Sequence, residues 1–97
     1  MNKLRQIPPG EILKGELDFL GYSASHFAKL LNVPTNRITA ILNAQRSITA
    51  DSALRLAEFF GTTPEFWMNL QTSYELKRIS AKFGKQIKSE VQPKDAA

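Results

Sequence analysis

Apolar residues recur at helical spacing in two short segments near the middle of the chain, where one apolar residue is followed by two more at i+3 and i+4. They are Phe27, Leu30 and Leu31 in the first segment and Ile38, Ile41 and Leu42 in the second. Residues 32–34, between the segments, read Asn-Val-Pro. Asparagine tolerates the left-handed conformation in which many helices end, and the residue before a proline is disfavoured in a helix. Two short helices joined by so tight a turn are typical of a helix-turn-helix unit.

A further helix is predicted before this unit. Residues 8–10, Pro-Pro-Gly, interrupt any earlier structure, and Glu11 then places a negative charge where the helix dipole favours one. Gly21 is expected to end this helix, and Ser23 is placed to cap the helix that carries Phe27. The apolar face of the first helix consists of Leu13, Leu17 and Leu20, broadened by Ile12 and Phe19.

Two helices are predicted after the unit. The first has Thr49 as a cap and Asp51 as a first-turn acid, and Gly61 is expected to end it. Its apolar residues are Ala53, Leu54, Ala57 and Phe60. The second begins at residues 63–65, Thr-Pro-Glu, because a proline at the first helical position loses no hydrogen bond, and we expect it to end at Gly84. Its apolar residues are Phe66, Trp67, Leu70, Tyr74, Leu76, Ile79 and Phe83.

Five helices with short connections and no credible strand predict an all-α fold. More specifically, they predict a helix-turn-helix domain of five helices with a C-terminal dimerisation helix. The 97 residues are enough for one small domain with a single core. We expect residues 1–8 to form an N-terminal arm and residues 9–84 to form the domain. Residues 85–97 are mostly polar and contain Pro93, and we expect this tail to be disordered.

The distribution of charge sets the helix-turn-helix unit apart from the rest of the chain. The whole chain has a net charge of +4, yet residues 19–50 contain no aspartate or glutamate. Residues 23–46 contain three basic side chains, whereas residues 47–75 are net acidic. A surface that meets DNA phosphates must exclude carboxylates, because each would be repelled by the backbone. The alternative is a chance gap on a solvated surface, but the gap coincides with the predicted DNA-binding unit.

The second helix of such a unit enters the major groove with its N-terminal residues toward the bases. Because Ile38, Ile41 and Leu42 turn inward, its outward face holds Thr, Asn and Arg instead of the usual Glu and Lys. Asparagine bonds an adenine edge, threonine touches a thymine methyl, and arginine grips guanine or phosphate. Thr35 also offers a capping bond at the helix start. The predicted base-reading residues are Thr35, Asn36, Arg37, Thr39, Ala40 and Asn43.

Phosphate contacts are expected on both sides of this recognition helix. The N-terminus of the preceding helix offers backbone N–H groups that favour an anion, and the loop after the recognition helix offers side-chain donors. Such contacts position a protein on DNA but carry little sequence information. The predicted phosphate-binding residues are Ser23, Ser25, His26, Gln45, Arg46 and Thr49.

One such domain covers few base pairs, so we expect a homodimer whose recognition helices, about 34 Å apart, match the half-sites of a palindrome. The last helix offers more apolar surface than a small domain needs for its own core, which predicts an isologous interface there. Its aromatic residues are better explained by the core or this interface than by base stacking, because residues 47–75 are acidic. The predicted interface residues are Phe66, Trp67, Leu70, Tyr74 and Leu76.

Composition argues against several other functions. The chain has no cysteine, which excludes disulfides, thiol catalysis and cysteine-based zinc sites. Its one histidine, His26, is expected to be exposed and suits a phosphate contact better than a general base, and no spacing of His, Asp or Glu suggests a metal site. We therefore expect no enzymatic activity, cofactor, metal or small-molecule substrate. Without a membrane-length apolar run or a signal-peptide core, a cytoplasmic protein with no membrane partner is expected.

Beyond these general features, residues 9–76 resemble the HigA antitoxin family of XRE-type helix-turn-helix repressors. A helix-turn-helix alone would indicate only DNA binding. The sequence Thr-Pro-Glu-Phe-Trp-Met-Asn-Leu-Gln is much more specific to this family and lies within the last of the resembling segments. These segments are residues 9–13, 36–38, 41–43, 48–57 and 59–71.

The resemblance implies an antitoxin that neutralises a HigB-like toxin, typically a ribosome-dependent mRNA endonuclease, and represses the shared operon at a double-stranded DNA operator. It also implies the five-helix, lambda-repressor-like fold and a dimer through the C-terminal helices. Two other interpretations stay open. One is a phage-type transcriptional repressor without a toxin, which the absence of a neighbouring toxin gene would favour. The other is a protein-interaction module that has lost DNA binding, against which the acid-free stretch and the Asn/Arg/Thr face argue.

Overall fold

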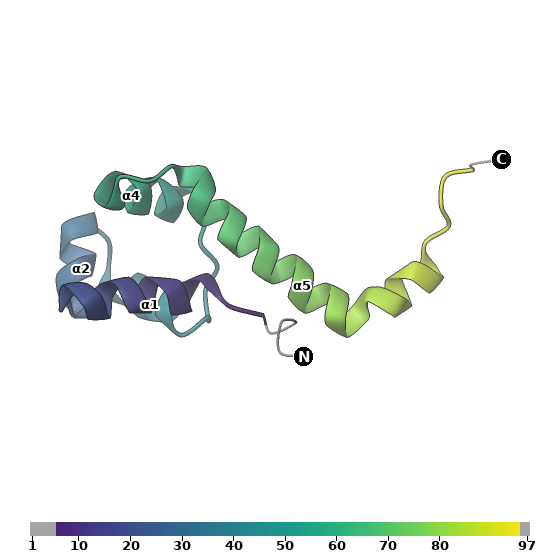
Figure 1. The fold of residues 1–97 in the computed structure, drawn as a ribbon, viewed down its shortest axis with the longest axis horizontal. Helices are drawn as coiled ribbons and strands as arrows, with labels where there is room; N and C mark the ends of the chain where they lie inside the picture. The colour runs from purple at the N-terminus through teal and green to yellow at the C-terminus, as the bar shows by residue number, and fades with distance from the viewer. Residues whose placement is uncertain (1–5, 96–97) are drawn as a thin grey trace.

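The computed structural model describes residues 6–95, which form five α-helices and no β-strand (Figure 1). The helices are α1 Pro9–Leu20, α2 Ala24–Leu31, α3 Thr35–Leu42, α4 Ala50–Phe60 and α5 Pro64–Glu90. Helices α1 to α4 pack together with the first part of α5, and the rest of α5 extends away from them. The predicted all-α, five-helix fold is confirmed. Most of the predicted N-terminal arm and the last two residues of the predicted tail lie outside the described residues.

Local side-chain chemistry sets the ends of most helices. The Ser23 hydroxyl accepts a hydrogen bond from the backbone N–H of His26 at 3.0 Å and caps α2, as predicted. The Thr63 hydroxyl caps α5 in the same way through the N–H of Phe66, at 3.1 Å. Asn32 ends α2 in the left-handed conformation with φ 59°, so it supplies the tight turn before α3. Gly21 and Gly61 end α1 and α4 in the same conformation.

One apolar core joins the five helices. Its largest fully buried side chains are Leu13, Phe27, Ile38, Ile41, Ile48, Leu56 and Trp67. The Trp67 ring of α5 lies 5.5 Å from the Phe60 ring of α4, and its Nε1 donates to the Thr62 hydroxyl at 2.9 Å. The assignment of Trp67 to a dimer interface is therefore wrong. A side chain that is 2% exposed within one chain has almost no surface left for a partner.

Several apolar residues that were predicted to face inward are exposed. They are Ile12, Leu20, Leu30 and Leu54, together with Phe19, which is 87% exposed. Helical spacing identifies a broad apolar stripe but not how much of it other helices cover. Helix α2 packs against α3 and α4, and α4 packs mainly against α5, so the edges of their apolar stripes remain at the surface.

The prediction that the last helix ends at Gly84 is wrong, because α5 continues for 27 residues to Glu90. A glycine inside a helix costs only about 1 kcal/mol relative to alanine and does not stop a helix by itself. The next four residues, 85–88, favour or tolerate helix, and the Gln86 amide donates to the Glu90 carboxylate one turn later at 2.9 Å. The predicted disordered tail is thus helical over its first six residues.

Helix α1 begins directly against the end of α3. Gly10 is buried there, and a Cβ atom at this position would overlap the backbone carbonyl oxygen of Ile41. The missing side chain lets the two backbones approach closely, so α1 supports the C-terminal end of α3. Among the described residues, no helix is both long and apolar enough to cross a membrane.

Candidate nucleic-acid interface

Helix α3 presents an uncharged polar face away from the core. Thr35, Asn36 and Asn43 are exposed, whereas Ile38 and Ile41 are buried. Thr39 and Ala40, on the same face, are half-buried. The Thr39 hydroxyl donates to the backbone carbonyl of Asn36 at 3.3 Å, and its oxygen can still accept a hydrogen bond.

The start of α3 carries no side-chain cap. Pro34 occupies the cap position in an extended conformation, with φ −64° and ψ 147°, and no side chain bonds the first N–H groups. The prediction of a Thr35 cap is wrong, because Thr35 is the first helical residue and not the residue before the helix. The positive end of the helix dipole therefore faces outward with its first N–H groups not capped by a side chain, an arrangement that attracts hydrogen-bond acceptors.

The N-terminus of α2 belongs to the same helix pair, since α2 packs against α3. Ser23, Ser25 and His26 are exposed there, as predicted. The His26 ring meets the Tyr22 ring edge-on at 4.7 Å, which orients the imidazole. The Ser23 oxygen already accepts the capping bond, but its hydroxyl hydrogen can still be donated to another group.

Arg37 does not share the outward face of its neighbours. Its Nη1 donates to Asp51 Oδ1 of α4 at 2.5 Å, and its side chain is 22% exposed. Arg55 donates to the same oxygen through Nε at 2.8 Å. The hydrogen bonds from Arg55 and then Arg37 lower the pKa of the Asp51 carboxyl. The prediction that Arg37 points toward base edges is thus wrong for this structure, because its charge is directed at α4.

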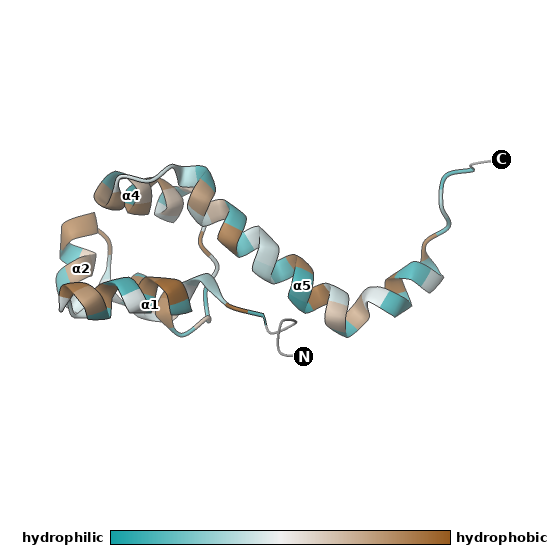
Figure 2. Ribbon diagram, in the orientation of Figure 1, coloured by the Kyte–Doolittle hydropathy of each residue, from teal (hydrophilic) through white to brown (hydrophobic). Residues whose placement is uncertain are grey.

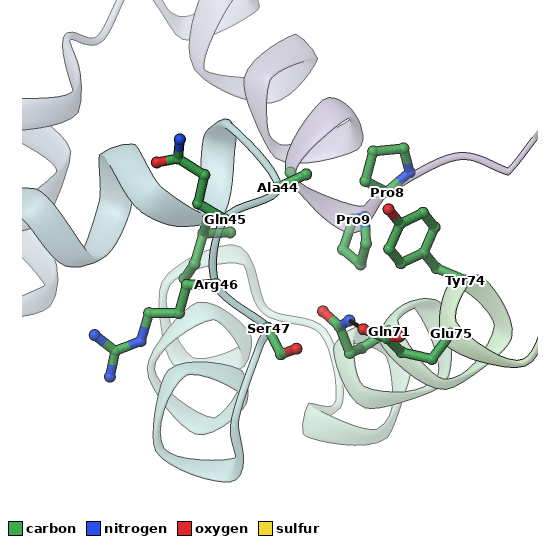
Figure 3. A pocket seen from close by; sticks show the side chains of 11 residues that line it. Pro8, Pro9, Ala44, Gln45, Arg46, Ser47, Gln71, Tyr74 and Glu75 are labelled. Carbon is green, nitrogen blue, oxygen red and sulfur yellow. Dashed lines mark hydrogen bonds between the residues drawn. The ribbon is translucent and has the colours of Figure 1, made fainter. Parts of the chain in front are cut away.

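The loop between α3 and α4 projects two further predicted residues. Gln45 and Arg46 are exposed, and Figure 3 shows both side chains pointing away from Tyr74 and Glu75 of α5. Arg46 makes no hydrogen bond or ion pair within residues 6–95. Ala44 turns the chain after α3 with a positive φ of 59°.

Buried groups on the core side of the same loop hold it in place. Ile48 is 2% exposed, and its backbone N–H donates to Gln71 Oε1 of α5 at 2.8 Å. Thr49 stands at the cap position of α4, as predicted, and is exposed, but its side chain makes no capping bond. Its hydroxyl keeps both hydrogen-bonding functions for another acceptor or donor.

A small pocket of about 110 Å³ lies between this loop, the start of α1 and α5 (Figure 3). The Gln71 amide in its wall donates to Glu75 Oε2 at 2.9 Å. Arg78 donates to Glu75 Oε1 at 2.6 Å, and this bond lowers the pKa of the Glu75 carboxyl. A carboxylate held ionised by an arginine is a poor general acid or base. Among the described residues, no cluster of three His, Asp or Glu side chains forms a metal site.

Two residues that matter here were not predicted from the sequence. Asp51 was assigned only to the first turn of α4, yet its carboxylate lies against Arg37, 14 residues earlier in the chain. Gln71 was not singled out, although it follows the core residue Trp67 by four residues and so shares its buried face. That spacing was the available signal for Gln71. The Asp51 contact had no local signal.

The comparisons place the chain among helix-turn-helix proteins, and several of the similar proteins are HigA antitoxins. Residues 20–67 match the protein-family model for a helix-turn-helix. An addiction module antidote protein of the HigA family from Coxiella burnetii is 63% identical, with a TM-score of 0.88 over 93% of this chain and 99% of that chain. The Pseudomonas aeruginosa antitoxin HigA, solved with the higBA promoter, is 43% identical, with a TM-score of 0.87 over 92% and 98% of the two chains.

A curated relative supports the same assignment. The antitoxin HigA-1 of Vibrio cholerae is 36% identical over 75 residues, which are 76% of this chain and 70% of the relative. The matched region of the helix-turn-helix model contains α2, α3 and α4, and the solved structures extend the similarity over most of α1 and α5. The chain belongs to the HigA antitoxin family of helix-turn-helix proteins.

Proposed function

We propose that this protein is an antitoxin that also represses its own operon as a dimer bound to a palindromic DNA operator. The outward face of α3 is the observation that carries the proposal. Thr35, Asn36 and Asn43 are exposed there on a helix pair that contains no acidic residue. The Pseudomonas aeruginosa HigA structure, which includes the higBA promoter, supports operator binding by a chain with this fold.

In the proposed complex, α3 lies in the major groove and its uncharged residues read base edges. Asn36 and Asn43 have the side chain that bonds an adenine in bidentate fashion, and Thr35 and Thr39 suit a thymine methyl or a single hydrogen bond. Ala40 is small enough to let the helix approach. The uncapped first turn of α3 adds backbone donors at the end that points into the groove.

Phosphate contacts are proposed on both flanks of this helix. The Ser25 and His26 side chains and the N–H groups of α2 suit the backbone on one side, with Ser23 as a hydroxyl donor. On the other side, Gln45, Arg46 and Thr49 are the proposed donors. Arg46 is the strongest of these, because its charge has no partner within residues 6–95.

The dimer is proposed to form through the protruding part of α5. Trp67 and Gln71 face the core, and Leu76 follows Trp67 by nine residues, which is two and a half helical turns, so it faces the opposite side. Leu76, Ile79, Phe83 and Ile87 are spaced by three, four and four residues and form one apolar stripe. Figure 2 shows apolar residues recurring along this part of the helix.

Of the interface residues predicted from the sequence, Leu76 lies on this stripe. Phe66 is 44% exposed and stays a candidate contact nearer the domain. Leu70 and Tyr74 are half-buried against the domain. We therefore propose an interface centred on Leu76 and continuing toward Ile87.

The proposal of a toxin partner rests on the family and not on a particular surface of this chain. We propose that the protein binds and neutralises a HigB-like toxin encoded beside it, and that it has no enzymatic activity of its own. A repressor must meet DNA, so the location that we propose is the cytoplasm.

Co-purification of the neighbouring gene product with the tagged full-length chain tests the toxin partner. A neighbouring gene product that neither binds nor inhibits growth when expressed alone would favour a repressor without a toxin.

The DNA-binding proposal is tested with the DNA upstream of the gene and a scrambled duplex of the same length. We expect a preference of about 10³ or more for the upstream DNA at physiological salt. Asn36→Ala combined with Thr39→Ala should reduce this preference and leave binding to the scrambled duplex unchanged. Leu54→Ala, on the exposed edge of α4, is the control variant and should bind as the wild type does. Equal binding of the wild type to both duplexes would refute sequence-specific repression.

A further inference from the structure

We infer that Asp51 is a specificity-determining positioning residue, which holds Arg37 against α4 so that α3 reads DNA with uncharged side chains. Arg37 then sets the orientation of α3 and does not bind phosphate or guanine. The inference rests on the proposed function, since it assumes that α3 enters the major groove. It assigns a role to an acid that the sequence pattern placed outside the DNA-binding unit.

The Asp51 carboxylate joins three helices at one point. Its Oδ1 accepts from Arg37 Nη1 of α3 at 2.5 Å and from Arg55 Nε of its own helix at 2.8 Å. Arg55 also donates through Nη1 to the Leu31 carbonyl at the end of α2, at 2.9 Å. No N–H group of α2 donates to that carbonyl, because it lies in the last turn of the helix. The cluster therefore fixes the start of α3 relative to the end of α2 and the start of α4.

Several features favour this arrangement over a swinging Arg37 side chain. Hydrogen bonds between ionised groups are shorter and stronger than neutral ones, and Oδ1 receives two of them. Asp51 lies in the first turn of α4, where the positive end of the helix dipole stabilises its charge. The Arg37 side chain is less exposed than that of Asp51, 22% against 55%, so it lies against the domain and not out in solvent.

The consequence for recognition concerns the balance of specific and nonspecific binding. An arginine on the reading face would bind any phosphate and strengthen nonspecific binding, with a salt dependence of about 0.9 in log K per log salt for each phosphate contact. Paired with Asp51, Arg37 adds no such contact. The Asn and Thr side chains then determine the affinity for the bases. The ratio of specific to nonspecific affinity is therefore higher than it would be with a free arginine on this face.

The test measures binding of the full-length protein to upstream and scrambled duplexes as a function of salt. Arg46→Ala is the reference for a lost phosphate contact. In this variant the slope of log K against the logarithm of salt concentration should be less steep by about 0.9 per domain. Arg37→Ala should weaken upstream binding by about 10-fold through misorientation of α3 while its salt dependence stays that of the wild type. Asp51→Asn should release Arg37, strengthen scrambled-duplex binding and steepen its salt dependence by about 0.9 per domain.

Conservative replacement separates this role from simple support of the fold. Asp51→Glu keeps the negative charge and should retain the weak scrambled-duplex binding of the wild type, with thermal unfolding recorded for every variant. The inference would be overturned if Arg37→Ala reduced the salt dependence of binding as much as Arg46→Ala does, because Arg37 would then be a phosphate contact. An Asp51→Asn variant that is folded, with unchanged salt dependence and preference, would also overturn it. A wild type without preference refutes the proposed function itself, and the inference with it.

Discussion

Gln71 is one of two buried polar side chains among the described residues, the other being Ser52. Both ends of the Gln71 amide are satisfied: its oxygen accepts from the Ile48 N–H at 2.8 Å, and its nitrogen donates to Glu75 at 2.9 Å. Burying an amide without such partners would cost about 1–3 kcal/mol. Gln71 therefore ties the loop after the recognition helix to α5 without destabilising the core.

Trp67 offers a test of the core at the level of one residue. Trp67→Ala should lower the free energy of unfolding by about 3–5 kcal/mol, because it removes a large buried ring that packs on Phe60. Phe66→Ala is the neighbouring control, and it should cost about 1 kcal/mol because that ring is partly in solvent. Urea unfolding at one fixed protein concentration measures both. Equal losses would contradict the placement of Trp67 in the core.

Asp51 also predicts how stability depends on pH. Its pKa is lowered from 3.8 in the folded protein by Arg55 and Arg37, so its stabilising contribution is complete above 3.8 and is lost as the pH falls through the folded value. The stability difference between the wild type and Asp51→Asn should therefore be constant between about pH 5 and pH 8 and shrink in stronger acid. Urea midpoints across this range measure the difference. A difference that changes between pH 5 and pH 8 would contradict the direction of the pKa shift.

Two residue-level predictions failed because a distant partner decides the role of the side chain. Ser23 was correctly predicted as a cap because its partner, His26, is three residues away. Arg37 and Trp67 were misassigned because their surroundings come from other helices. The amino acid type gives the chemistry that a side chain offers. Only the packing of helices decides whether DNA, a second subunit or the core receives it.

At the scale of the helix, the packing of α1 on α3 depends on one glycine. Gly10→Ala should destabilise the protein by about 1–3 kcal/mol, because its Cβ would overlap the Ile41 carbonyl oxygen and force the helices apart. Gly15→Ala, in the same helix, meets nothing within 4 Å and should stabilise the protein by about 0.5–1 kcal/mol. Thermal unfolding of the two variants should move in opposite directions. The same sign for both would mean that the close contact is absent in solution.

The helices themselves were largely predictable, and their environments less so. Periodicity correctly identified Ile38 and Ile41 as buried, because both lie at the centre of their stripe. The same pattern overestimated the burial of Leu30 and Leu54, which lie at the edges of theirs. Gly84 was misjudged as a helix end because glycine weakens a helix without breaking it, whereas the left-handed turn at Gly61 ends one.

For the whole molecule, the elongated shape raises the question of what the far half of α5 is for. The chain measures 56 × 28 × 21 Å because this helix extends well beyond the other four (Figure 1). Phe83 and Ile87 are 38% and 45% exposed there. An exposed apolar stripe on a protruding helix is unfavourable in water, and a second copy of the same stripe would cover it symmetrically.

Charge placed on this stripe should therefore separate the subunits. Leu76→Lys with Phe83→Lys should give the mass of a monomer by sedimentation equilibrium, because two lysines on each copy would be buried against their equivalents. Ala81→Lys with Ser89→Lys adds the same charge to exposed positions on the other side of α5 and should leave the mass of the wild-type dimer unchanged. Operator affinity should fall by about 10²–10⁴ only in the first variant, since its two recognition helices would bind independently. A monomeric wild type, or equal dissociation of both double variants, would contradict an interface on this stripe.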